Sequence, residues 1–356
     1  MRTLRKVKIK GFKSIASAEI ELRDLNVVIG ANGSGKSNLI GAFKLLERLV
    51  ARKLQDHVAS QPERLLHHGR KVTAALGMEI LTDDFTYSFK LAPGSDNLFF
   101  EFEQLQYAGK YALDVASTNG HAESAVDWLL AAQRLDLPKQ SFAGIRNLAI
   151  HHFHDTSDGA PSKGMCDLHD NRRLGTDAGN LAAYLYLLQE KHPVAFRQVE
   201  EHVRLVAPFF DSFVLAPSRL NENKIKLEWR QKGSDAYFDG HSLSDGTLRF
   251  ICLATLLLQP APPALILLDE PELGLHPYAI HILAEMLESA SKGSQVLLAT
   301  QSVTLLNQFA PADVLVAENT GGATSFKRLD ETALAQWLAD FSLGELWEKN
   351  VLGGRP

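Results

Sequence analysis

Residues 30–37 of this 356-residue chain, which read Gly-Ala-Asn-Gly-Ser-Gly-Lys-Ser, restrict its fold more than any other segment. They match the phosphate-loop pattern G-x-x-x-x-G-K-[ST] and follow a largely apolar, β-branched run at residues 25–29, which is typical of a strand buried on both faces. Apolar residues at helical spacing from Leu39 to Val50 predict a helix directly after the loop. This context favours a nucleotide-binding α/β fold over a glycine turn with an incidental lysine.

The loop supplies most of the predicted nucleotide contacts. Its glycines let backbone N–H groups approach the phosphates, Lys36 reaches the β- and γ-phosphates, and the Ser37 hydroxyl holds Mg²⁺. The nucleotide-binding residues predicted here are Gly30, Ala31, Asn32, Gly33, Ser34, Gly35, Lys36, Ser37 and Asn38.

Two carboxylates end a second apolar run. Residues 265–268 predict a buried strand, and Asp269-Glu270-Pro271 follow it at the end where open α/β sheets bind their ligands. We expect Asp269 to hold Mg²⁺, directly or through water, and Glu270 to orient and deprotonate the attacking water. A turn that merely ends a strand is the alternative, and the phosphate loop in the same chain weighs against it.

A third segment presents hydrogen-bond donors. Residues 243–249, Leu-Ser-Asp-Gly-Thr-Leu-Arg, open a predicted helix that continues into the apolar run 250–254. A serine hydroxyl, a glycine and a helix N-terminus together can face an anion.

These segments, followed by Gly274-Leu275-His276-Pro277, occur in the order that resembles ABC-type ATPases. The chain looks most like their RecF/SMC-like branch, and within it like the stand-alone RecF-type AAA-family ATPases of bacteria. Residues 8–14, the long insertion before residue 243, the run 269–277 and the ending 346–356 carry this likeness.

The resemblance implies an ATP-hydrolysing enzyme that works as a head-to-tail homodimer. In such a dimer, Ser244 and Gly246 of one subunit would close on the γ-phosphate held by Lys36 of the other, and residues 274–277 would touch the partner. The predicted fold is α/β, a P-loop NTPase of ABC-ATPase type with a mixed core sheet, a smaller antiparallel β-subdomain and an inserted helical lobe. We predict the core at residues 1–70 and 207–356, the β-subdomain at 71–110 and the mainly helical lobe at 111–206.

Several elements are predicted from periodicity. Strand patterns occupy much of residues 72–105, and helical patterns cover 122–135 and 181–206, separated by a polar loop at 155–177. Beyond it, residues 278–289 predict a helix, and residues 295–300 and 314–317 predict buried strands.

Three departures from the family pattern matter. The segment Ala299-Thr300-Gln301-Ser302 lacks the usual histidine; Gln301 can hydrogen-bond a phosphate or the water, but it cannot carry a proton, so we hypothesise slow hydrolysis. The lid glutamine has no clear match, and Gln55 and Gln61 are candidates. Thr247 stands where transporters usually have glutamine, which points away from the transport branch.

Two basic or histidine-rich segments allow alternative interpretations. Lys6, Lys8 and Lys10 alternate along one predicted strand, either as a DNA contact or, more in keeping with an antiparallel strand, as a solvated face. The resemblance also places Lys13 near the nucleotide. The cluster His151-His152-Phe153-His154 suggests a metal, although a satisfied or surface cluster is favoured.

Composition sets outer limits. A formal charge of −5 argues against non-specific coating of nucleic acid but permits a local basic patch. Cys166 and Cys252 are far apart and lack metal-ligand spacing, which predicts neither a disulfide framework nor a zinc site and favours the cytoplasm. No apolar run is long enough to span a bilayer, so no membrane contact is expected.

Three functions remain open at this point. The first is a DNA-repair or genome-maintenance ATPase whose dimer grips DNA. The second is an ATPase subunit that controls a separate effector protein, such as a nuclease in phage defence. The third, weakened by the inserted lobe, Thr247 and Gln301, is the nucleotide-binding subunit of a transporter.

Overall fold

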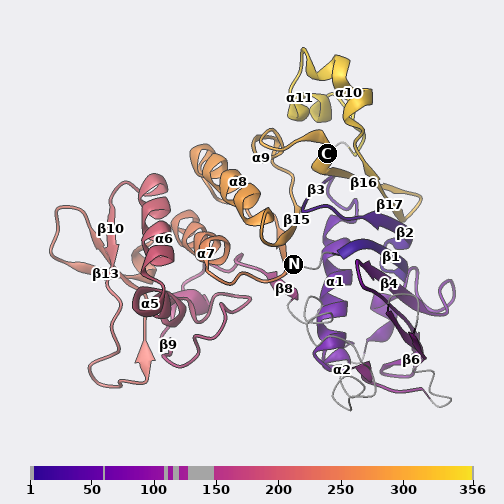
Figure 1. Cartoon of the computed structure of the whole chain (residues 1–356), viewed down its shortest axis with the longest axis horizontal. Coiled ribbons are helices and arrows are strands. Elements are labelled where there is room, and N and C mark those ends of the chain that lie inside the picture. Colours follow the sequence, from indigo (N-terminus) through magenta and orange to yellow (C-terminus); the bar gives the residue numbers. More distant parts are fainter. Residues whose placement is uncertain (1–3, 59–60, 108–110, 115–119, 127–147, 355–356) are drawn as a thin grey trace. The chain divides into compact units, whose positions relative to one another are not determined.

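The computed structural model describes residues 4–58, 61–107, 111–114, 120–126 and 148–354. The chain divides into two compact units (Figure 1). Unit 1 comprises Met1–Ala149, Ala264–Leu267 and Ser294–Pro356, and unit 2 comprises Ile150–Pro263 and Leu268–Gly293.

The core sheet is mixed and has the strand order β17-β16-β3-β15-β14-β8. Both β15 and β16 pair in parallel with β3, whereas β17 is antiparallel to β16. Every residue of β3 and β15 is buried, because helices or loops cover both faces of a parallel sheet. The strands are β3 (Leu25–Ile29), β8 (Leu148–His151), β14 (Leu265–Asp269), β15 (Gln295–Ala299), β16 (Val314–Thr320) and β17 (Ala323–Arg328).

A second sheet of unit 1 is antiparallel, with the order β2-β1-β4-β5-β6-β7. Its strands alternate buried and more exposed residues, as expected for a sheet with one face on the core. They are β1 (Leu4–Phe12), β2 (Ile15–Glu21), β4 (Leu76–Thr82), β5 (Phe85–Pro93), β6 (Leu98–Tyr107) and β7 (Tyr111–Asp114).

The helix after the phosphate loop contacts both sheets of unit 1. Its apolar residues recur at helical spacing, and it packs on β1 and on β15 (Figure 1). The described helices of this unit are α1 (Lys36–Val50), α2 (Leu54–Val58), α9 (Val303–Leu306), α10 (Glu331–Leu338) and α11 (Leu343–Glu348), with the 3₁₀ turns η1 (Pro62–Leu65) and η4 (Pro311–Asp313).

Unit 2 is built around packed helices. Helix α6 packs against α5, α7 and α8, and α7 packs against α8 (Figure 1). The helices are α5 (Leu181–Lys191), α6 (Pro193–Val206), α7 (Asp245–Leu258) and α8 (Pro277–Ser291), with the 3₁₀ turns η2 (Pro161–Lys163) and η3 (Gly240–Ser242). Two small sheets join β10 (Phe210–Phe213), β12 (Glu228–Gln231) and β13 (Tyr237–Asp239), and β9 (Cys166–Asp167) with β11 (Lys224–Ile225).

The fold class predicted from the sequence is confirmed: a mixed α/β core sheet accompanies an antiparallel sheet. The helical pattern at 181–206 is two helices, because Pro193 has no N–H to donate and disfavours helical backbone at His192. Most of the pattern at 122–135 lies outside the described residues. The predicted division into three parts (1–70 with 207–356, 71–110, 111–206) stays a prediction.

Candidate nucleotide site

The phosphate loop lies between β3 and α1 of unit 1, where the sequence places it. The Lys36 ammonium is buried and donates to the carbonyl oxygens of Gly30 (2.7 Å) and Ala31 (2.9 Å). Ser37 is exposed at the start of α1. The lysine is therefore held in place by the first two residues of the loop, while Ser37 is accessible to solvent.

A network that the motif does not reveal fixes the far side of the loop. Thr324 Oγ1 donates to the Ser34 carbonyl (2.9 Å) and lies 2.7 Å from Ser14 Oγ, which accepts from Asn38 Nδ2 (2.7 Å). Gly35 adopts φ +104°, and a Cβ there would overlap Thr324 Oγ1. The loop is therefore pinned to β17, and the Asn38 amide donates to Ser14.

The acidic strand end lies in unit 2. Asp269 Oδ1 is buried and has no hydrogen-bond partner among the described residues, which is costly unless a ligand satisfies it. Glu270 has φ +43°, a left-handed conformation that costs a non-glycine residue about 1–2 kcal/mol and is often found at functional sites. Both features agree with the predicted roles of these carboxylates.

The segment 243–249 begins α7 as expected. Ser244 is the N-cap: its Oγ accepts from the Thr247 N–H (3.2 Å) and lies 2.8 Å from Thr247 Oγ1. Ser244 and Asp245 are exposed and Gly246 is partly exposed, so the helix N-terminus is accessible to solvent. Thr247 thus has a local role in this chain, because its side chain braces the capping serine.

Arg249 joins three segments of unit 2, a role the sequence does not reveal. Its buried guanidinium donates to the carbonyls of Phe153 (2.9 Å), His154 (3.1 Å) and Leu273. Burial lowers its pKa, but the side chain stays charged. The arginine therefore ties α7 to the loop that follows β14 and to the segment that follows β8.

A second tie in unit 2 is made by two glycines. A Cβ on Gly246 would overlap the carbonyl oxygen of Gly274, which itself has φ +79°. The residues predicted to contact the γ-phosphate and the partner subunit are thus in direct backbone contact with each other.

This contact predicts that Gly246→Ala destabilises unit 2. Alanine favours helix by about 1 kcal/mol, but a clash with a backbone carbonyl typically costs about 1–3 kcal/mol. We expect the melting temperature to fall by a few degrees, on the scale of about 2–4 °C per kcal/mol. Gly159→Ala is the matched control, because nothing lies within 4 Å of a Cβ there. Equal melting temperatures for the two variants would show that the contact can relax.

Gln301 follows β15 in unit 1 and precedes Ser302, the N-cap of α9. Of the two candidates for the lid glutamine, Gln55 makes hydrogen bonds within unit 1. Its Nε2 donates to the carbonyls of Leu98 (2.8 Å) and Ala122 (2.5 Å). Its Oε1 accepts from the Leu98 N–H. Gln61 is exposed. Gln55 therefore links α2 to Leu98 and Ala122, and its assignment as the lid glutamine stays a prediction.

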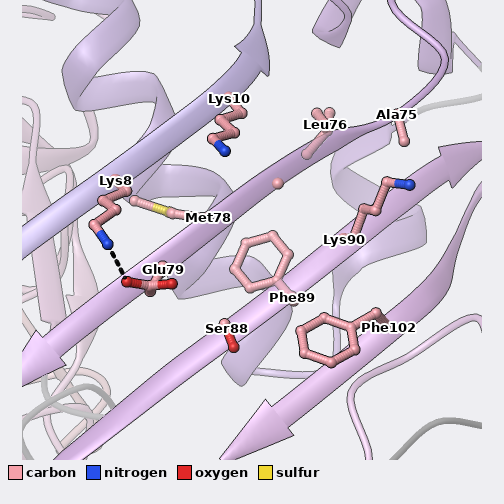
Figure 2. Close-up of a pocket in the computed structure, with 11 residues that line it drawn as sticks. Lys8, Lys10, Ala75, Leu76, Met78, Glu79, Ser88, Phe89, Lys90 and Phe102 are labelled. Carbon is pink, nitrogen blue, oxygen red and sulfur yellow. Dashed lines mark ion pairs between the residues drawn. The ribbon is translucent and has the colours of Figure 1, made fainter. Parts of the chain in front are cut away.

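The lysines of β1 mostly lie in ion pairs. Lys6 Nζ is 2.6 Å from Glu19 and Lys8 Nζ is 2.7 Å from Glu79. Figure 2 shows this second pair. Both of its residues line a hollow of about 410 Å³. Lys10, Gly77 and Lys90 also line it and are cross-strand neighbours. Lys90 is itself paired with Glu101 (2.7 Å). The face therefore agrees better with a solvated sheet surface than with a row of free cations.

The histidine cluster and Lys13 are the other two candidates from the sequence. His151 is buried, which lowers its pKa to about 4, so it is neutral near pH 7. Among the described residues, no group of three or more His, Cys, Asp or Glu side chains could hold a metal ion. Lys13 has φ +47° and is half-buried, and burial is the main cause of its lowered pKa.

A family model described as "AAA domain, putative AbiEii toxin, Type IV TA system" matches residues 25–307. The chain belongs to this AAA_21 family of P-loop ATPases. The match covers the phosphate loop, the segment 243–249 and the Asp-Glu strand end together.

Solved structures show the same fold. A Smc head bound to the C-winged helix domain of ScpA is 18% identical, with a TM-score of 0.63 over 93% of this chain and 99% of that one. A Smc head derived from Pyrococcus furiosus is 15% identical, with a TM-score of 0.62 over 96% and 99%. At these identities the likeness establishes the fold alone, which is that of SMC-type ATPase heads. The family match confirms the P-loop ATPase that the sequence predicts.

Two curated relatives are similar over shorter stretches. A "Putative ABC transporter ATP-binding protein" of Methanosarcina acetivorans is 35% identical over 80 residues, which are 22% of this chain and 28% of that protein. The "ABC-type transporter ATP-binding protein EcsA" of Bacillus subtilis is 25% identical over 207 residues, 57% of this chain and 79% of that one. The first match thus spans little more than a quarter of its relative's length.

Proposed function

We propose that this chain is an ATP-hydrolysing, RecF-like ATPase that closes as a head-to-tail homodimer when it binds ATP, in DNA repair or genome maintenance. The observation that carries this proposal is the exposed N-terminus of α7, with Ser244 as its cap. In the proposed dimer, that terminus closes on the γ-phosphate held by Lys36 of the other copy. The fold shared with Smc heads supports the same arrangement.

The residues present fit ATP and Mg²⁺. The phosphate loop offers an ammonium and an exposed serine, and the buried Asp269 Oδ1 lacks a protein partner among the described residues. When bound, the metal would neutralise charge on the phosphates, with Ser37 and Asp269 as its protein ligands. Glu270 would accept the proton of the attacking water, Lys36 would bind the phosphate oxygens, and Gln301 would orient the water through its side-chain amide.

Gln301 leads to a prediction about rate. An amide can hydrogen-bond the attacking water but cannot carry a positive charge, so we expect turnover well below the tens per second of an ordinary enzyme. Gln301→His should raise the steady-state rate, measured as phosphate release at saturating ATP, by about tenfold or more. Gln308→His, on a partly exposed glutamine of the same region, is the control. A wild-type rate of tens per second would refute slow hydrolysis.

DNA binding is tested by its salt dependence. Fluorescence anisotropy with duplex DNA should show ATP-dependent binding that weakens steeply as salt rises, because Lys and Arg contacts release counterions. If the DNA affinity depends on neither ATP nor the salt concentration, the proposed DNA role is wrong and the ATPase assignment is unaffected.

A second candidate function is control of a separate effector protein in phage defence. The family description, which names a toxin and a toxin–antitoxin system, favours it. A nuclease-like gene beside this one, whose product co-purifies with the ATP-bound dimer, would support that role. Recombination genes in that position would support DNA repair.

A transporter role is the weakest of the three, although the curated relatives are named as transporter ATP-binding proteins. No helix in the described part of the chain is both long and apolar enough to cross a membrane. Thr247, which stands where transporters usually have glutamine, contacts the capping Ser244 in this chain, and this departure weighs against the role.

A further inference from the structure

Residues 352–354, here named the C-terminal turn, lie against the first residue of the phosphate loop. The Gly354 N–H donates to Glu318 Oε1 (2.7 Å), and the Gly354 carbonyl accepts from Trp347 Nε1 (2.9 Å). Trp347 is completely buried, so it anchors the turn. A Cβ on Gly354 would lie 3.4 Å from Gly30 Cα and only 2.7 Å from Val316 Cγ1.

The same contacts lead to the catalytic lysine. Gly30 is a neighbour of the C-terminal turn, since a side chain at position 354 would reach it, and its carbonyl oxygen accepts the hydrogen bond from Lys36 Nζ (2.7 Å). Gly30 also has no space for a side chain, because a Cβ there would overlap the Ala317 carbonyl and would lie 2.6 Å from Ser34 Oγ. The Gly30 peptide therefore has little room to move, and the C-terminal turn forms one of its walls.

The turn and the loop also share an open surface. A hollow of about 410 Å³ is lined by residues 31–34 of the loop, residues 317–320 at the end of β16, and Asn350 and Gly354. Glu318 is exposed and lines this hollow, so its hydrogen bond to Gly354 lies beside the phosphate loop rather than in the core.

We infer that Glu318 and Gly354 are positioning residues for ATP binding: they hold the C-terminal turn against Gly30 and so keep the phosphate loop in its binding conformation. This inference rests on the proposed ATP binding. A glycine is needed at position 354 because its backbone is left-handed, at φ +61°, and because a side chain would push on Val316 and Gly30. If the turn moves away, the loop loses a wall and its ordering must be achieved when ATP binds, which weakens binding.

The test compares Glu318→Ala and Gly354→Ala with the wild type and with Glu348→Ala, which removes an exposed carboxylate of α11. ATP affinity is measured by calorimetry with magnesium, together with KM, kcat and the melting temperature without nucleotide. We expect Glu318→Ala, which removes one charge-assisted hydrogen bond, to raise Kd and KM for ATP about tenfold. Gly354→Ala keeps the N–H, but its side chain would push the turn away from Val316 and Gly30, so Kd and KM should rise in the same direction. The melting temperature of Glu318→Ala should stay close to that of Glu348→Ala, whereas Gly354→Ala is expected to melt lower because of its left-handed backbone and its clash with Val316.

A conservative variant separates positioning from charge. Glu318→Gln keeps an acceptor oxygen for the Gly354 N–H, so its ATP affinity should stay within about threefold of the wild type. If Glu318→Ala lowers the melting temperature but leaves Kd unchanged, the turn is a structural brace only and the inference is wrong. If Gly354→Ala does not fold, Glu318→Ala decides alone. A wild-type protein that binds no ATP would instead overturn the proposed function itself.

Discussion

Glu270→Gln is expected to bind ATP but to lose almost all hydrolysis and to accumulate as a dimer. The amide keeps the size of the side chain and its hydrogen-bonding oxygen, but it cannot take a proton from water. Loss of a general base typically costs about 10²–10⁴-fold in kcat. Since closure precedes hydrolysis in the proposed cycle, blocking hydrolysis should trap the closed dimer.

The measurement is the molar mass in solution, by light scattering after size exclusion, with ATP and magnesium. Glu285→Gln, on an exposed position of α8, is the control and should behave as wild type. If Glu270→Gln remains a monomer while binding ATP with unchanged affinity, the shared-site dimer is wrong. Adding duplex DNA to the same samples shows whether the closed form has a higher DNA affinity than the open one.

A double variant tests the head-to-tail geometry. Ser244 is exposed at the start of α7, so Ser244→Arg adds a bulky side chain that the monomer can accommodate in solvent. In the Glu270→Gln background it should abolish the dimer and leave the weaker ATP binding of a single copy, because the phosphate loop is untouched but the contact from the partner is lost. A dimer that survives this change would use a different interface.

The sequence predicted the contiguous parts of the candidate site because each is recorded in a few neighbouring residues. The strand before Gly30 is a short, fully buried run rich in β-branched residues, so its composition indicates a strand. The helix after Lys36 has one apolar face, which its periodicity indicates. Asp269 likewise ends a run of four buried residues. Patterns of this kind can be recognised from neighbouring residues alone, and the fold class follows from their order along the chain.

The supporting contacts were not predictable, because they join residues far apart in the sequence. Thr324 reaches Ser34 across 290 positions, and nothing about a threonine in an edge strand indicates a phosphate-loop partner. Arg249 is buried, and an arginine is almost never buried unless its donors are paired. Its carbonyl partners, however, depend on tertiary packing.

Gly246 also has a tertiary contact that the sequence does not reveal. Gly246 was predicted to matter for a ligand, yet the structure also gives it an internal reason, the close approach of the Gly274 carbonyl. A residue can satisfy both demands, so a loss of activity in Gly246→Ala would not by itself identify the γ-phosphate contact. Ser244, whose side chain is exposed, is the cleaner probe of the interface.

Lys36→Ala is expected to have the largest effect on nucleotide binding. The ammonium donates to two loop carbonyls and, in the proposed complex, exchanges them for phosphate oxygens. Loss of a charge-assisted hydrogen bond is worth about 1.5–3 kcal/mol, so ATP should bind about 10- to 150-fold more weakly. Lys44→Ala, further along α1, removes the same charge away from the loop and is the control.

The nucleotide series shows whether this loss is direct. Because the lysine is assigned to the β- and γ-phosphates, Lys36→Ala should weaken ATP and ADP binding strongly and leave any AMP binding unchanged. Equal weakening for all three nucleotides would mean that the variant loop has collapsed, since its Gly30 and Ala31 carbonyls have lost their donor. In that case the lysine's main role would be to hold the loop open, and its contact with phosphate would be secondary.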